Sequence, residues 1–387
     1  MKYHGLVISD LHVGAFPIEK LYQEFKYSFL EKIKEMKQLD FIIFCGDVFD
    51  HRLFLNERES YYVYRMMEEM INLCKDDIKI RFVYGTESHE NNQYGFFSNL
   101  KGDIRIIKTV ETEELFPDCN VLYLPEEYIT DQKSYYEKYF IEDAYAMVFG
   151  HGIIKEFVEI MAVQIENIGT KRKHVPAFTC KELEKMCKGS TFFGHYHVHR
   201  EKERVCYIGS FSRWQFGEEE PKGFYEVTYD TKKETCKKTF IENTLADSYT
   251  TISYDAGNPI FKNIDHIETA VAHAKKVIES EGIDHVRFQF QIPSSVENPE
   301  FLSRMIQDEF KFNDQVRINF SNNQKQKKIK EKEGKEKHTY DFIFDKNIKF
   351  ENKTAHFIEI EYNKTIPVKR VASYLYDPLQ EIIEKEE

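Results

Sequence analysis

The first 90 residues repeat one pattern, in which a short apolar run ends in a polar cluster and an amphipathic stretch of helical length follows. HGLVISD ends at Asp10, FIIFCGD ends at Asp47, and IKIRFVYG ends at Gly85. Helical periodicity covers about residues 18 to 38 and 57 to 75, between these runs. The alternation predicts strands joined by helical crossovers, and therefore a parallel sheet in an α/β fold. Active residues in such sheets gather at the carboxyl ends of the strands.

More strand-like runs follow, and the pattern changes after about residue 250. The runs are IRIIKTV, NVLYLP, AYAMVFGH, STFFGHYH, VCYIGS and GFYEVTYD, and we expect the last three to form one closing sheet. A β-α-β-α-β order then predicts a separate small α/β module, with helices at about 265 to 281 and 298 to 310. A Lys/Glu-rich stretch with almost no apolar side chain follows it, which is typical of a linker or an exposed helix. We expect four parts, at residues 1–245, 246–320, 321–339 and 340–387.

Composition narrows the classes of protein to which the chain can belong. Hydrophobic residues make up 41% of the chain and aromatics 15%, which indicates a folded globular protein. No apolar run reaches membrane-spanning length, so we expect no membrane partner. The N-terminus lacks the pattern of a secretory signal, and the seven scattered Cys fit reduced thiols, so we expect a cytoplasmic protein. The net charge of -12 counts against a nucleic-acid partner but does not exclude one, because basic segments lie at Lys171–His174 and Lys325–Lys337.

Five motifs with metal-ligating side chains end apolar runs in a fixed order. They are D-x-H at 10–12, G-D at 46–47, G-T-E-S-H-E at 85–90, G-H at 150–151 and G-H-x-H at 194–197. A single His is more often a structural imidazole, but five motifs in order are not expected by chance. Oxygen and imidazole ligands without thiolate suit Mn, Fe or Zn, and two such ions about 3.5 to 4 Å apart can clamp a phosphate. The motifs predict metal-assisted phosphoester hydrolysis, with His89 as the proton donor to the leaving oxygen.

These motifs resemble the signature of the calcineurin-like metallophosphoesterase superfamily over about residues 6 to 200. Residues 207 to 227, YIGSFSRWQFGEEEPKGFYEV, are similar to the segment that follows the last metal motif in SbcD-type exonuclease subunits, the bacterial and phage relatives of the meiotic recombination nuclease. The resemblance implies a four-layer α/β/β/α sandwich, a small α+β capping domain and a C-terminal partner-binding tail. It also suggests a phage-encoded protein.

The resemblance also implies the role of each site residue. One metal ion would be held by Asp10, His12, Asp47 and His197, and the other by Asp47, His151 and His195, with Asp47 as the bridge.

The third motif departs from the family, because Ser88 stands where the family has an Asn that gives the second metal a carbonyl oxygen. Ser88 is therefore the expected ligand, with Glu87 or a water as the alternatives. His51 and Arg213 are candidates for contact with the substrate.

The leading hypothesis is a manganese-dependent exonuclease and endonuclease that acts on DNA ends, hairpins and single strands. By resemblance it would bind an SbcC-type coiled-coil ATPase through residues 321–387. The resemblance also implies a homodimer; residues 60 to 70 could form its interface or could instead pack in the core. One alternative is a phosphodiesterase or phosphatase for nucleotides or phosphoproteins, which would need neither the segment 207 to 227 nor the C-terminal parts. The other is a catalytically silent scaffold, which only the altered third motif supports.

Overall fold

The computed structural model describes most of the first 254 residues and parts of the rest. The described residues are 1–157, 175–254, 271–273, 275–276, 279, 282–293, 299–309, 315–321, 352–355 and 367. The basic segment Lys171–His174 lies outside them, as do the linker 321–339 beyond its first residue and most of the segment 340–387. The chain divides into two compact units: one of Met1–Ile252, Val271–Phe288 and Phe310–Val316, the other of Ser253–Ala270, Gln289–Glu309 and Arg317–Glu387. The four-part division stays a prediction.

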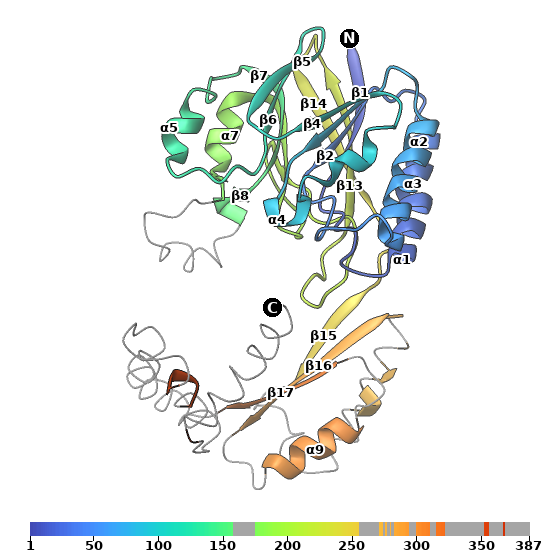
Figure 1. Cartoon of the computed structure of the whole chain (residues 1–387), viewed down its shortest axis with the longest axis vertical. Coiled ribbons are helices and arrows are strands. Elements are labelled where there is room, and N and C mark those ends of the chain that lie inside the picture. Colours follow the sequence, from blue (N-terminus) through green and yellow to red (C-terminus); the bar gives the residue numbers. More distant parts are fainter. Residues whose placement is uncertain are drawn as a thin grey trace, which may run out of the picture. The chain divides into compact units, whose positions relative to one another are not determined.

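The first sheet of the larger unit contains the parallel strands that the sequence predicts (Figure 1). Its order is β14-β13-β1-β2-β3-β4, in which β1, β2, β3 and β4 run parallel to one another. The strands are β1 (Lys2–Ile8), β2 (Phe41–Cys45), β3 (Lys79–Val83), β4 (Asp103–Ile107), β13 (Gly223–Asp230) and β14 (Thr235–Glu242). All five residues of β2 are buried, as expected for a central strand that is covered on both faces.

The second sheet has the order β11-β12-β10-β7-β6-β5. Its strands are β5 (Glu111–Phe116), β6 (Cys119–Leu124), β7 (Tyr145–His151), β10 (Cys187–Gly194), β11 (Arg200–Lys202) and β12 (Val205–Tyr207). We predicted that the last three strand-like runs, which form β10, β12 and β13, belong to one closing sheet. That prediction is wrong, because β10 and β12 pair in the second sheet whereas β13 pairs antiparallel with β1 in the first. The alternating burial of a strand indicates which face is buried, but not which strand lies beside it.

Helices cover the outer face of each sheet, which gives the four layers (Figure 1). On the first sheet lie α1 (Ile18–Glu24), the π-helix η1 (Phe25–Leu30), α2 (Glu31–Glu35) and α3 (Arg58–Leu73). On the second lie α5 (Gln132–Glu137) and α7 (Cys180–Met186). Between the sheets, one apolar cluster joins residues of both, such as Val7 and Ile43 with Val121 and Phe149. The fold is therefore the α/β/β/α sandwich.

The amphipathic pattern of α3 explains its position. Val63, Met66, Met67 and Met70 are fully buried and follow the spacing of one helical face. They pack in the core between the helices and the first sheet, whereas Tyr61 is exposed. Most of the apolar side chains between residues 60 and 70 therefore serve core packing, and the homodimer stays a prediction.

The remaining elements are short or belong to the three-stranded sheet. Near the first sheet lie α4 (Glu87–Glu90) and the 3-10 helix η2 (Gln93–Phe97), and beyond β7 lie β8 (Ile153–Ile154), η3 (Lys155–Phe157) and β9 (Ala177–Phe178). A separate sheet has the order β15 (Tyr249–Tyr254), β16 (His285–Pro293), β17 (Gln315–Ser321), and α9 (Pro299–Glu309) precedes its last strand. Of the helix expected at 265 to 281, the described residues from 271 to 279 are helical. Among the described residues, no helix has the length and apolarity needed to span a bilayer.

Candidate metal centre

The site is built at the carboxyl ends of strands from both sheets. Asp10 follows β1 and Asp47 follows β2, whereas His151 ends β7 and His195 follows β10. Because β1 and β2 are parallel, as are β7 and β10, each pair of side chains emerges at the same edge of its sheet. Asp10, Asp47 and His151 are buried. The order of apolar runs and polar ends in the sequence therefore places these ligands together.

The backbone at the site is held in unusual conformations. Asp10, His12, Asp47 and His195 all have positive φ, at 49°, 47°, 48° and 116°. Such conformations cost about 1–3 kcal/mol each and cluster at functional sites. Gly46, with φ of 86°, is required for a second reason, since a Cβ there would collide with the imidazole of His151. The backbone therefore adopts unfavourable conformations that bring the candidate ligand atoms together, at a cost in conformational free energy.

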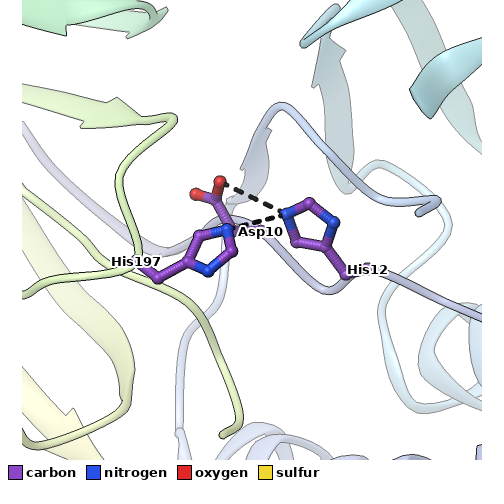
Figure 2. Close-up of side chains that lie close together, drawn as sticks. All are labelled: Asp10, His12 and His197. Atoms are coloured by element: carbon purple, nitrogen blue, oxygen red, sulfur yellow. Dashed lines mark hydrogen bonds and ion pairs between the residues drawn. The ribbon is translucent and has the colours of Figure 1, made fainter. Parts of the chain in front are cut away.

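The first group of ligand atoms comes from Asp10, His12 and His197 (Figure 2). The Nε2 atoms of His12 and His197 are 3.1 Å apart, and Asp10 Oδ1 is 3.8 Å from His12 Nε2. Figure 2 shows the two imidazole rings and the carboxylate converging from three sides. Two nitrogens at this separation need a proton or a cation between them, because their lone pairs otherwise repel.

Carboxylates behind these two imidazoles fix their orientation. His12 Nδ1 is 3.2 Å from Asp50 Oδ1, and His197 Nδ1 is 2.5 Å from Glu218 Oε1. Each Nδ1–H donates to its carboxylate, so the Nε2 lone pair faces the centre, as in most metal-binding histidines. The hydrogen bond from His12 holds the pKa of Asp50 down to about 2. Burial opposes ionisation of His12, but Asp10 and Asp50 outweigh it and raise the pKa of His12 to about 9.

The second group consists of Glu126, His151 and His195. Glu126 Oε2 lies 2.9 Å from His195 Nδ1 and 3.5 Å from His151 Nε2. Both nitrogens are buried without a hydrogen-bond partner, although the carboxylate is near. His151 Nδ1 donates to the carbonyl oxygen of Cys45 at 2.8 Å, which leaves Nε2 as the free acceptor atom. Two buried imidazole nitrogens that face a carboxylate without a hydrogen-bond partner are what a cation site requires.

Asp47 lies between the two groups. Its Oδ2 is 3.7 Å from His12 Nε2, 3.3 Å from His151 Nε2 and 3.1 Å from His89 Nδ1. The backbone N–H of Thr86 donates to the other oxygen at 2.7 Å. Burial would raise the pKa of Asp47, but His151 and then His89 hold it well below its usual range. Burial likewise opposes protonation of His151, yet Asp47 raises the pKa of His151 well above its usual value. The carboxylates thus attract positive charge to this point.

The other residues predicted for the site are placed as follows. His89 contacts Asp47 and is about one-third exposed, at 32% of its side chain. Ser88 is exposed on α4, as is its neighbour Glu87. His51 is exposed, with Nδ1 3.1 Å from Asp50 Oδ2. Arg213 donates to the backbone carbonyls of Glu220, Ala246 and Asp247, a pattern typical of a structural residue. Substrate contacts by His51 and Arg213 stay predictions.

Sequence reasoning missed four residues that surround the cluster: Glu126, Asp50 and Glu218, described above, and Trp214. The Trp214 ring centroid is 5.0 Å from that of His12 and 4.8 Å from that of His197. Glu126 follows the apolar run NVLYLP and so has the same signal as Asp10 and Asp47, a carboxylate directly after a strand. Asp50 ends the motif G-D-V-F-D and Glu218 lies in the stretch 207 to 227, but only the structure shows that they contact His12 and His197.

The donor set fits two divalent cations. Carboxylate oxygens and imidazole nitrogens, with no thiolate among the clustered atoms of the described residues, suit Mn, Fe or Zn. The unpartnered nitrogens of His151 and His195 support the fit, because a neutral buried imidazole otherwise needs a hydrogen bond at this atom. When bound, two such cations supply positive charge for the oxygens of a phosphoryl group.

Comparison with known proteins identifies the family of the chain. One similar solved structure is described as a novel archaeal phosphodiesterase. It is 15% identical to this chain, with a TM-score of 0.30, and the match covers 62% of this chain and 99% of that chain. A likeness this low carries no argument about activity. No curated protein matches the chain. The model of the calcineurin-like phosphoesterase family matches residues 5–230, which is more than half of the 387 residues. The chain therefore belongs to the calcineurin-like phosphoesterases.

Proposed function

We propose that this phosphoesterase is a metal-dependent DNA exonuclease and endonuclease, the nuclease subunit of an SbcC/SbcD-like complex that processes DNA ends in repair, recombination or replication. The observation that carries the proposal is the position of residues 207 to 227, the stretch that resembles SbcD-type subunits. Trp214 of this stretch packs on His12 and His197, and Glu218 holds the Nδ1 of His197. The resemblance is thus concentrated in residues that shape the metal centre.

Buried Lys222 ties this stretch to the same histidine. Its Nζ donates to the backbone carbonyl of His197 at 2.6 Å and lies 3.5 Å from Glu218 Oε2. Burial lowers the pKa of Lys222, and Glu218 opposes that shift. A buried cation that contacts both Glu218 and His197 fixes their relative positions, so the stretch and the centre form one structural unit.

The chain's own residues divide the chemistry between them. Asp10, His12 and His197 would hold one cation and His151 and His195 the other, with Asp47 shared between them. When bound, such cations would supply the positive charge that favours ionisation of a water and offsets phosphoryl charge. Asp47 accepts from His89 Nδ1, which leaves the other ring nitrogen of this partly exposed imidazole for the substrate. From there a protonated His89 can donate its proton to the leaving oxygen as a general acid.

The choice of metal and partners belongs to the proposal as well. Manganese suits the mixed oxygen and imidazole donors, and an SbcC-type ATPase would bind residues 321–387, most of which lie outside the described residues. DNA ends, hairpins and single strands are the expected substrates. A homodimer and a cytoplasmic location complete the expectation.

A nuclease assay tests the proposal. Linear and hairpin DNA are incubated with Mn²⁺ or Mg²⁺ and the full chain, with and without an SbcC-type partner. Wild type should cleave DNA, and Asp47→Ala and His89→Ala should lose cleavage by about 100-fold or more, because a bridging ligand and a proton donor are removed. His51→Ala serves as a comparison at an exposed imidazole beside the site.

Two results would contradict the proposal and separate it from the alternatives. Hydrolysis of a small phosphodiester such as bis(p-nitrophenyl) phosphate without DNA cleavage, even with the partner present, would favour a phosphodiesterase for small substrates. An absence of metal binding and of all hydrolysis would favour the scaffold.

A further inference from the structure

The third sequence motif leaves the second cation one ligand short. Ser88 and Glu87, which the sequence offers for this place, are both exposed on α4. The structure instead brings a carboxylate from another strand to the two imidazoles of the second group. We propose that Glu126 supplies the missing oxygen ligand of the second cation in this chain, an inference that rests on the proposed function only in requiring a two-metal centre.

The position of Glu126 follows from the sheet. It comes directly after β6, whose neighbour β7 runs parallel to it and ends at His151. Its backbone N–H donates to the carbonyl of Tyr84 at 3.0 Å, which fastens this loop to the loop that follows β3. The carboxylate therefore emerges at the same edge of the second sheet as His151 and His195.

The orientation of the carboxylate is set by the oxygen that faces away from the imidazoles. The hydroxyl of Tyr128 donates to Glu126 Oε1 at 2.5 Å. This contact directs Oε2 toward His195 Nδ1, at 2.9 Å, and His151 Nε2, at 3.5 Å. The side chain of Glu126 is fully buried, at 0% exposure. Metal-ligating carboxylates are commonly held in this way by a hydrogen bond to the non-ligating oxygen.

A simple structural ion pair explains the arrangement less well. In a structural pair each imidazole would donate an N–H to the carboxylate, yet His151 Nε2 and His195 Nδ1 make no hydrogen bond. The carbonyl oxygen of Cys45 accepts the Nδ1–H of His151, so the neutral form of His151, which is the form that binds a cation, presents the Nε2 lone pair to the oxygen of Glu126. In that form the Nε2 lone pair of His151 and the carboxylate oxygen of Glu126 face each other at 3.5 Å, an arrangement that a cation between them would stabilise.

The substitution changes the charge of the centre. With Asp10 and Asp47, Glu126 gives three carboxylates among the clustered ligand groups, where an amide oxygen would leave two. A more negative set of ligands binds a divalent cation more tightly, since each added carboxylate contributes attraction in a buried site of low dielectric constant. We therefore expect the second cation to be retained in this chain despite the altered third motif.

Metal binding by the full chain tests the inference without any DNA. Wild type, Glu126→Ala, Glu126→Gln and Ser88→Ala are titrated with Mn²⁺ by calorimetry, and electron paramagnetic resonance reports coupled Mn²⁺ pairs. Wild type should bind two ions. Glu126→Ala should weaken one of them by at least about 10- to 100-fold and abolish the coupled signal, whereas Ser88→Ala should keep both. Glu126→Gln, which keeps a neutral oxygen, should lose less than Glu126→Ala.

Tryptophan fluorescence is a second measurement, and it shows which of the two cations Glu126→Ala affects. Trp214, the single Trp of the chain, lies against His12 and His197 of the first group, so its quenching by Mn²⁺ reports that group. Quenching should persist in Glu126→Ala, which also shows that the variant is folded. Glu137→Ala, at an exposed glutamate on α5, is the matched control and should bind two ions as wild type does.

Several outcomes would overturn the assignment. It is wrong if both Glu126 variants bind two ions with unchanged affinity, if Ser88→Ala loses the second ion, or if wild type binds fewer than two ions. A chain that binds two ions through Glu126 and yet never cleaves DNA would contradict the proposed function alone.

Discussion

Replacing Glu24 by Gln should stabilise the larger unit above neutral pH and have little effect in acid. Glu24 ends α1, is 1% exposed, and accepts one hydrogen bond from Asn243 Nδ2 at 2.8 Å. Lys20 Nζ is 4.0 Å from its other oxygen, which has no hydrogen-bond partner. Burial raises the pKa of Glu24 from 4.5 to about 7, although Ser212 and Asn243 oppose the shift. The folded state therefore favours the protonated carboxyl.

The magnitude follows from proton linkage. A carboxyl whose pKa is raised by folding costs stability as the pH rises above its unfolded value, and the cost is complete above the folded value. For pKa values of 4.5 and about 7, the cost is about 0.8 kcal/mol at pH 5 and about 3.3 kcal/mol at pH 8. Gln has the same shape and stays neutral, so the stability gained by Glu24→Gln should grow by about 2.5 kcal/mol between these pH values.

The assay is urea unfolding at pH 5 and pH 8 in the presence of EDTA, followed by the fluorescence of Trp214. Because Trp214 is the single Trp, the signal reports the larger unit alone. Glu35→Gln, at an exposed glutamate on α2, is the control and should show no such growth. A gain from Glu24→Gln that is equal at both pH values would refute the reasoning, because the effect would then come from packing and not from ionisation.

Three further predictions concern the site and the contact between the sheets. Glu218→Gln should weaken the first Mn²⁺ by about 10- to 100-fold, because the charged partner of His197 Nδ1 is lost, and calorimetry measures this directly. Glu113→Ala should lower the free energy of unfolding by about 1.5–3 kcal/mol in urea, since it removes one carboxylate partner of Arg81, which is 1% exposed, joins the two sheets and keeps Asp103 as its other partner. Lys34→Met, at the exposed pair with Glu31, should cost less than about 1 kcal/mol, and equal losses would contradict this account. Gly46→Ala should abolish metal binding, because its Cβ would displace an imidazole ligand, and unchanged affinity would count against the geometry.

The sequence alone predicted the parallel strands of the first sheet and most of the candidate ligands. Apolar runs that alternate with amphipathic stretches can form a stable sheet only as parallel strands with helical crossovers, and β1 to β4 follow that order. The clustering of Asp10, Asp47 and His151 was predictable because each follows or ends an apolar run, so the fold brings it to the sheet edge. These are local signals, fixed by the period of burial and by the strand that precedes each ligand.

Only the tertiary structure decided which distant side chains complete the centre. The strand β13 pairs with β1 instead of β12, since strand pairing depends on register and on the other faces to be covered, not on the strand's own residues. The roles of Glu126 and Glu218 depend on distances to imidazoles on other loops, and on the backbone and side-chain contacts that fix each tautomer. The residues in such contacts follow no regular spacing in the sequence, because packing of the two sheets brings distant segments together.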